Sequence, residues 1–274
     1  MAKSSSGSMS FLQHLEVLRW HLVRSTAAIF LFGGIAFFAK SILFDQIIFG
    51  PKNPHFVTYR IFCEVTTALT GKGLFCMDAL PFQILNTKMA GQFSIHIWVS
   101  LIAGFIVAFP YLIWEMWRFI KPGLHSTERK YSRGVLFFGA ILFAIGVLFG
   151  YYIIAPLSIQ FLGTYSVSAD VTNFIDLSSY ITTVSTVTLA CGLIFELPVL
   201  VYFLAKIGLL TPDWMRKYRK HSFVVILVLS AIITPPDITS QVLVTLPIVV
   251  LYEISIRICA RVVKKQEKAL AKTD

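Results

Sequence analysis

Long runs of apolar residues, separated by shorter polar segments, dominate the chain. Six such runs occupy residues 21–44, 90–114, 134–157, 177–207, 222–234 and 241–259. A membrane-crossing helix needs about 20 predominantly apolar residues, and most of these runs reach that length. The pattern predicts an all-α polytopic membrane protein with six transmembrane helices, of which the fifth and sixth are short.

The fourth run, Leu177–Ile207, carries one carboxylate near its middle, Glu196, followed by Pro198. A helix of this length exceeds a hydrocarbon layer of roughly 30 Å, so it must tilt or bend. Pro198 lacks a backbone donor and supplies a place for the bend. Because a carboxylate is costly at this depth, we interpret Glu196 as functional; the alternative is a protonated side chain bonded to a neighbouring helix.

The polar segments predict the domain organisation. Residues 1–20 form an N-terminal segment without a cleavable signal, in which Met1–Ser8 is expected to be a disordered or added leader. Residues 21–259 form the transmembrane domain, with a long outer loop at 45–89, and residues 260–274 form a basic tail. If the loop faces an oxidising compartment, its Cys63 and Cys76 could form a disulfide.

Basic residues indicate the orientation. Lys and Arg concentrate in the N-terminal segment, in the loops after the second and fourth runs and in the tail, whereas the loops after the third and fifth runs have none. The positive-inside rule then places both termini in the cytoplasm. We attribute the formal net charge of +10 to topology and contact with membrane lipids, not to nucleic acid binding.

Composition and motifs exclude several function classes. The chain is 56% hydrophobic and 14% charged, whereas soluble domains have about 25% charged residues. Because no nucleophile–base set, phosphate loop or metal-ligand cluster is recognisable, we expect no enzyme activity, cofactor or metal. Two classes remain: a proton-coupled secondary solute transporter that uses Glu196, and a receptor or scaffold that binds a basic peptide. The sequence has no second copy of the Glu196 break, which favours the scaffold.

Several short motifs follow one another in a characteristic order over about residues 11–260. They are His14-Leu15 with Leu18-Arg19, Pro51, Pro110, Trp117-Arg118-Phe119, Pro122-Gly123-Leu124, Glu128-Arg129-Lys130, Phe195-Glu196-Leu197-Pro198, Thr234-Pro235-Pro236-Asp237, Gln241 and Tyr252-Glu253-Ile254. In this order the chain resembles the TatC subunit of the twin-arginine (Sec-independent) protein translocase. The resemblance implies a concave, glove-like scaffold of six helices in the bacterial cytoplasmic (inner) membrane.

The resemblance also implies a function, that of a signal-peptide receptor and core scaffold. Such a protein binds twin-arginine signal peptides of folded cargo and nucleates single-span TatA-type and TatB-type subunits for export driven by the proton-motive force. The resemblance further implies a homo-oligomer within a larger complex. The expected chemistry is reasonable, because an arginine fork pairs with a carboxylate through two charge-assisted hydrogen bonds that lysine cannot reproduce.

The resemblance assigns roles residue by residue. The signal-peptide-binding candidates are Glu128, Glu16, Arg19, Phe119, Leu124 and Glu115. The partner-helix candidates are Glu196, Thr234 and Gln241, for which capping or interhelical hydrogen bonding is the alternative. Structural roles are expected for Pro51, Pro110, Pro198 and Asp237.

One position departs from the family pattern. Val17 stands where a second recognition Glu is expected, and Glu16 lies one residue earlier. One residue along a helix is a rotation of about 100°, so Glu16 cannot simply replace that acid. Three alternatives follow: Glu16 swings in, Glu128 and Glu115 carry more of the binding, or signal recognition is impaired.

Overall fold

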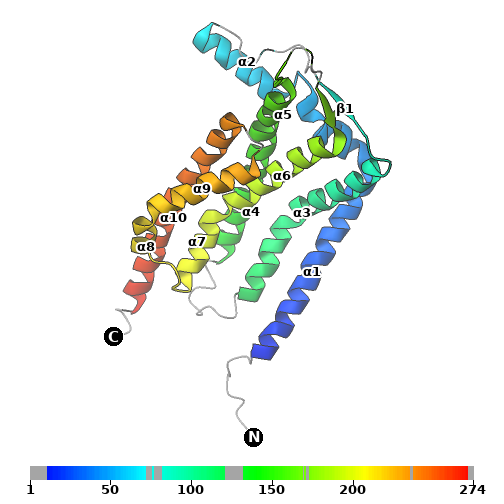
Figure 1. Cartoon of the computed structure of the whole chain (residues 1–274). Helices are drawn as coiled ribbons and strands as arrows, with labels where there is room; N and C mark the ends of the chain where they lie inside the picture. Colours follow the sequence, from blue (N-terminus) through cyan, green and yellow to red (C-terminus); the bar gives the residue numbers. More distant parts are fainter. Residues whose placement is uncertain are drawn as a thin grey trace. The chain divides into compact units, whose positions relative to one another are not determined.

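The structure is a computed structural model, and it describes residues 11–71, 76, 82–120, 132–168, 170, 173–234 and 237–270. Helices make up most of these residues (Figure 1). Five described segments are long and apolar enough to cross a membrane, namely Leu15–Phe38, Gly91–Phe119, Leu136–Thr164, Leu177–Lys206 and Ser240–Glu267. The all-α membrane class is therefore confirmed. The six-span count stays a prediction, because the fifth predicted span is α9 (Arg219–Ile233), a helix of only 15 residues.

The chain divides into two compact units, where the sequence predicted a single transmembrane domain. The first unit comprises Met1–Phe38 and Ser100–Ala140, and the second comprises Ala39–Val99 and Ile141–Asp274. Two helices, α3 (Gly91–Ile120) and α4 (Ser132–Phe149), run from one unit into the other.

In the first unit, α1 (Phe11–Phe38) lies beside α3 (Figure 1). Their backbones touch where a Cβ added to Gly104 would lie 2.4 Å from the backbone nitrogen of Gly33. Small residues allow helices to approach this closely in a membrane. α1 starts at Phe11 without a break, so the predicted N-terminal segment and the first span share one helix; no Pro or Gly interrupts residues 11–32.

In the second unit, the long predicted loop contains regular structure. It holds a π-helical turn η1 (Ile42–Ile48), a 3-10 turn η2 (Gly50–Lys52), helix α2 (Val57–Thr70) and strand β1 (Gln83–Leu85). β1 pairs in parallel with β2 (Phe174–Asp176), and Leu85 is opposite Asp176. The structure joins Cys63 of α2 to Cys76 in a disulfide.

A buried tyrosine anchors α2. The Tyr59 hydroxyl lies 2.9 Å from the carbonyl oxygen of Pro51 and 3.0 Å from that of Pro156. Burial raises the pKa of Tyr59, so the hydroxyl stays protonated and can donate. Pro51 is itself buried, and its carbonyl is one of the two anchoring acceptors, which gives this predicted structural residue a definite contact.

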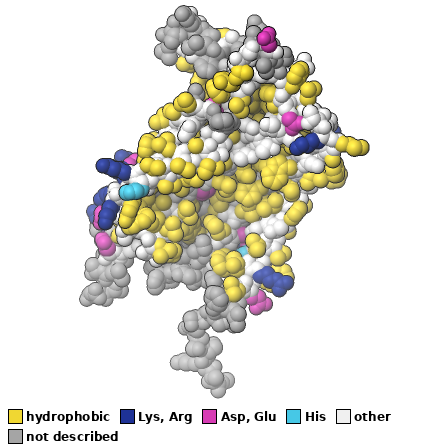
Figure 2. Space-filling model, in the orientation of Figure 1, with side chains coloured by type: hydrophobic (Ala, Val, Ile, Leu, Met, Phe, Trp, Pro, Cys, Tyr) yellow, Lys and Arg dark blue, Asp and Glu magenta, His cyan; other side chains and the backbone are white. Residues whose placement is uncertain are grey.

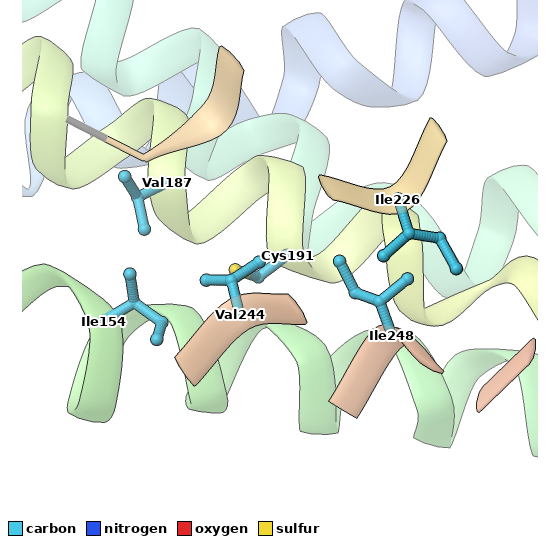
Figure 3. Close-up of a cluster of buried hydrophobic side chains, with 6 residues drawn as sticks. All are labelled: Ile154, Val187, Cys191, Ile226, Val244 and Ile248. Carbon is cyan, nitrogen blue, oxygen red and sulfur yellow. The ribbon is translucent and has the colours of Figure 1, made fainter. Parts of the chain in front are cut away.

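A cluster of buried apolar side chains joins four elements of the second unit (Figure 3). α4 continues through a π-helical turn η5 (Gly150–Ile154) into α5 (Ala155–Thr164), which is followed by α6 (Leu177–Phe195) and α7 (Leu197–Lys206). After α8 (Pro212–Lys217) and α9 comes α10 (Ile238–Leu270). The cluster draws its side chains from η5, α6, α9 and α10, and consists of Ile154, Val187, Cys191, Ile226, Val244 and Ile248.

The last helix is longer than its apolar run predicts. α10 continues to Leu270, so most of the predicted basic tail is helical. Val262 and Val263 pack against a buried cluster that includes Ala205. The Gln266 side chain also donates a 2.8 Å hydrogen bond to the carbonyl of Lys206, the last residue of α7. These contacts extend the helix beyond the membrane-spanning pattern.

The described surface in Figure 2 is mostly hydrophobic, with Lys and Arg confined to small areas. Exposed large apolar side chains occur on both units, for example Phe30 and Leu31 on α1 and Ile232 on α9. A soluble protein rarely exposes this much contiguous apolar surface, whereas lipid covers it in a membrane protein.

Candidate functional site

A buried carboxylate in the first unit joins α1 to α3. Glu115 is only 1% exposed, and its Oε1 accepts a 2.8 Å hydrogen bond from the Tyr111 hydroxyl. Arg118 lies 3.5 Å from the same oxygen. The other oxygen, Oε2, contacts Nδ1 of His21 on α1. Both oxygens of Glu115 are therefore engaged by side chains of the protein itself.

Helical spacing brings these groups together. Tyr111, Glu115 and Arg118 are four and three residues apart on α3, so they share one face. Arg118 is 46% exposed and stacks over the Trp114 ring at 4.7 Å, which leaves its charge near water. The carboxylate of Glu115 is thus enclosed and paired within the protein, and its role in signal-peptide binding stays a prediction.

Sequence reasoning missed His21. It is the first residue of the apolar run 21–44 and belongs to no motif, so only the fold reveals its contact with Glu115. The Phe119 ring, a predicted signal-peptide contact, lies 6.1 Å from the His21 ring in an edge-to-face arrangement. His21 and Phe119 thus extend the Glu115 contact into a small aromatic cluster.

The predicted recognition residues of α1 lie close to this cluster in sequence. Val17 precedes His21 by four residues and therefore lies on the same face of α1, one turn earlier. Glu16 and Arg19 are exposed. Glu128 and Leu124, the other two predicted contacts, lie outside the described residues.

The second candidate region is the break in the long apolar segment of the second unit. Glu196 lies between α6 and α7, and its N–H donates a hydrogen bond to the carbonyl of Leu193, three residues back. Pro198 has no backbone N–H and cannot donate a hydrogen bond to the carbonyl of Ile194, so the series of helical backbone hydrogen bonds is interrupted here. The helix is thus interrupted at the place where the sequence predicted a bend.

The carboxylate of Glu196 is half-buried in this break. Its Oε1 is buried and has no hydrogen-bond partner in the part of the chain that the structure describes. An unpaired buried acceptor is unfavourable unless another group binds it. The geometry therefore leaves Glu196 one acceptor position open to a donor from elsewhere.

Close helix packing fixes the position of Glu196. A Cβ added to Gly146 of α4 would lie 2.6 Å from the carbonyl oxygen of Cys191 and 2.8 Å from Cβ of Phe195. One added to Gly150 would lie 2.9 Å from Cα of Thr188. The two glycines, four residues apart, let α4 and η5 contact α6 directly, as the small-residue spacing suggests.

The third candidate region is the turn between α9 and α10. Thr234 is buried and donates a 2.8 Å hydrogen bond to the carbonyl of Ser230, and Gln241 donates a 3.5 Å bond to the carbonyl of Leu227. The carboxylate of Asp237 accepts a 2.7 Å bond from the Ser240 N–H and so caps α10. All three residues thus have internal bonds that match the structural alternative considered for Thr234 and Gln241.

Two further residues with predicted structural roles, Pro110 and Pro198, lie within helices. Pro110 lies inside α3, on an exposed face, and the helix continues past it. Pro198 is buried in the first turn of α7, where its missing N–H is not needed. In the described ranges no group of three or more His, Cys, Asp or Glu could hold a metal ion.

Comparison with known proteins gives consistent results. The family model for "Sec-independent protein translocase protein (TatC)" matches residues 13–247. The chain is similar to the Sec-independent protein translocase protein TatC of Blattabacterium sp. subsp. Periplaneta americana, with 40% identity over 96% of this chain and 100% of the relative. The corresponding protein of Aquifex aeolicus is 33% identical over 95% and 100%.

Solved structures match as well. A crystal structure of the "Twin Arginine Translocase Receptor- TatC" has a TM-score of 0.65 and 32% identity, covering 90% of this chain and 97% of that one. A second crystal structure of that receptor, in DDM, has a TM-score of 0.69 with 89% and 97% coverage. Sequence, fold and length agree throughout, and the chain therefore belongs to the TatC family of Sec-independent protein translocase proteins.

Proposed function

We propose that this multi-pass membrane component of a protein translocase is the receptor for twin-arginine signal peptides and the scaffold on which single-span partner subunits assemble. The observation that carries the proposal is the 32% identity, over 90% of the chain, to a crystal structure described as the twin-arginine translocase receptor. The proposal further places the protein in a bacterial inner membrane, with both termini in the cytoplasm.

Signal recognition is assigned to the predicted cytoplasmic ends of α1 and α3 and the segment that follows α3. Because Glu115 is paired with His21, Tyr111 and Arg118, we assign the arginine-binding carboxylates to Glu128 and to the exposed Glu16. Phe119 and Leu124 are assigned apolar contacts with the signal peptide. Losing one carboxylate of a sheltered arginine pair weakens binding by roughly 2–5 kcal/mol, against about 0–1 kcal/mol for an exposed pair.

Partner assembly is assigned to Glu196, with Thr234 and Gln241. The support is the buried Oε1 of Glu196, which lacks a donor among the described side chains and backbone groups. A polar group on a partner helix would satisfy it. Interhelical hydrogen bonds of this kind contribute about 0.6–2 kcal/mol in membranes.

Photo-crosslinking tests the receptor role. A twin-arginine peptide with a photoreactive group beside the arginines is irradiated with membranes that contain the intact chain, and the labelled segment is identified by mass spectrometry. We expect labelling within residues 115–133 or the first turns of α1, prevented by unlabelled twin-arginine peptide and not by a twin-lysine peptide. Glu128→Gln should abolish the labelling, whereas the matched variant Glu267→Gln, in the C-terminal part of α10, should not. Labelling that the twin-lysine peptide prevents equally well would contradict the proposal.

The buried Glu196 carboxylate also fits a proton-coupled solute transporter, which is the rival function. Proteoliposomes that contain this chain alone separate the two. The receptor should take up no solute in response to a proton gradient, whereas uptake that Glu196→Gln abolishes would favour the transporter.

A further inference from the structure

An open cavity lies in the second unit, beside the first turns of α6. Its volume is about 610 Å³, and a smaller opening of about 410 Å³ shares Lys88, Ser178 and Thr182 with it. We call the two together the Lys88 groove. Its lining includes the side chains of Lys88, Asp176, Ser178, Thr182, Thr186 and Ile232.

The two charged residues of the groove are brought together by the short parallel sheet. Leu85 of β1 is opposite Asp176 of β2, and the Thr87 hydroxyl donates a 2.9 Å hydrogen bond to Oδ2 of Asp176. The Asn86 side chain donates a 2.9 Å bond to the Lys88 carbonyl, which fixes the turn into α3. A cation and an anion are therefore held at the mouth of one groove by elements far apart in sequence.

Neither charge is neutralised by the other. Within the described part of the chain, Lys88 is exposed and forms no ion pair. The oxygens of Asp176 accept hydrogen bonds from the Thr87 hydroxyl and from the N–H of Ser178, and among the described residues no cation pairs with this carboxylate. A ligand with both a negative and a positive group could pair with both residues at once.

Hydroxyl groups continue the groove toward the membrane interior. Ser178, Thr182 and Thr186 are spaced by four residues, so they form a stripe on one face of α6 that spans about 12 Å. Thr182 and Thr186 are exposed, and their hydroxyls bond to no other described residue. Hydroxyls without partners are unfavourable in hydrocarbon, so the stripe requires water or a polar ligand.

The groove lies at the level where lipid head groups are found. The candidate spans begin at Gly91 and Leu177, so Lys88 and Asp176 lie just beyond the ends of two membrane segments. Ile232, at the end of the short helix α9, supplies an exposed apolar wall. The lining thus changes from charged, through hydroxylic, to apolar, as the chemistry of a phospholipid does.

We propose that the Lys88 groove binds the head group of a phospholipid that carries a primary amine. The phosphate pairs with Lys88 and accepts hydrogen bonds from the hydroxyl stripe, and the ammonium donates to Asp176, while the acyl chains lie against Ile232. A purely anionic head group would bring its charge toward Asp176. A quaternary ammonium has no N–H to donate to that carboxylate.

Native mass spectrometry of the purified full-length chain in detergent measures this preference. Phosphatidylethanolamine, phosphatidylcholine and phosphatidylglycerol with identical acyl chains are added in turn. We expect phosphatidylethanolamine to bind about tenfold more tightly than the other two, the difference that one charge-assisted hydrogen bond confers. Lys88→Gln should weaken binding of phosphatidylethanolamine, and Asp176→Asn should remove the preference for the primary amine while still capping α6. Lys52→Gln and Asp170→Asn, outside the groove, are the matched controls.

A crosslinking experiment on the unsubstituted chain tests the same proposal without depending on whether the variants fold. A photoreactive phosphatidylethanolamine in membranes should label residues 178–186. Three results would overturn the proposal: equal binding of the three lipids, tightest binding of phosphatidylglycerol, or labelling confined to other segments. If a single-span polypeptide displaces the lipid label from 178–186 and itself crosslinks there in lipid-free detergent, the groove is a protein-binding site instead.

Discussion

Nδ1 of His21 on α1 contacts Oε2 of Glu115 on α3, and this contact ties together the two helices of the first unit. A carboxylate that the sequence suggested for peptide binding thus stabilises the protein itself. The contact also fixes the rotation of α1 about its own axis. Because Val17 and His21 share a face of α1, the same contact sets the direction in which Val17 points.

Removing the Glu115 side chain should destabilise the first unit. Glu115→Ala leaves the Tyr111 hydroxyl and the His21 ring without their acceptor, which lowers the free energy of unfolding by about 1–3 kcal/mol. Arg118→Ala is the comparison, because its exposed ion pair contributes only about 0–1 kcal/mol. Thermal unfolding in detergent measures both, and equal effects of the two substitutions would contradict this role.

The backbone contact between α1 and α3 predicts a large effect from a single methyl group. In Gly104→Ala the new Cβ would lie 2.4 Å from N of Gly33 and 2.6 Å from the carbonyl oxygen of Ile29, so the helices must separate. Overpacking of this kind costs about 1–3 kcal/mol. Gly34→Ala is the matched control, because a Cβ there meets nothing within 4 Å. A control as unstable as Gly104→Ala would show that the close approach is not the cause.

Acid should weaken the start of α6. The hydrogen bond from Thr87, aided by bonds from Ser178, holds the pKa of Asp176 below its ordinary value, and this residue precedes the membrane-spanning segment. A depressed pKa in the folded protein means that the carboxylate stabilises it above a pH of about 4, and that this contribution is lost as pH falls through the folded pKa. The protection factor of the Ser178 amide, which is its hydrogen-exchange rate corrected for the intrinsic pH dependence, should therefore fall at low pH. Asp176→Asn should remove that dependence, and an unchanged pH profile in this variant would refute the assignment.

Glu196 should matter for assembly more than for folding. Its unpaired Oε1 predicts that Glu196→Ala weakens co-purification of a single-span partner by about three- to thirtyfold, the range of an interhelical hydrogen bond. Glu253→Ala is the control, because that carboxylate already accepts a 2.8 Å hydrogen bond from Arg219 on α9. Partner recovery that is unchanged in Glu196→Ala would leave the partner site without support.

The sequence predicted those features that depend on local composition. Apolar runs located the membrane segments, and Pro198 located the break beside Glu196, because hydropathy and a missing N–H act within a few residues.

Features that depend on distant residues were not predicted. The contact of His21 with Glu115, the approach of Gly33 to Gly104 and the pairing of β1 with β2 all join segments that no local pattern relates. The extension of α10 was also missed, because it rests on packing of Val262 and Val263 and on one hydrogen bond from Gln266. The membrane helices followed from the long apolar runs, whereas the contacts that each helix makes followed only from the fold.

Equilibrium binding of signal peptides to the purified chain tests the central claim most directly. A twin-arginine peptide and a twin-lysine peptide are titrated against the chain as it stands and against Val17→Glu. The account predicts that the chain with Val17 binds the twin-arginine peptide at least about tenfold more tightly than the twin-lysine peptide, because only arginine forms a bidentate pair with a carboxylate. Equal affinities for the two peptides, in both versions of the protein, would contradict the receptor function.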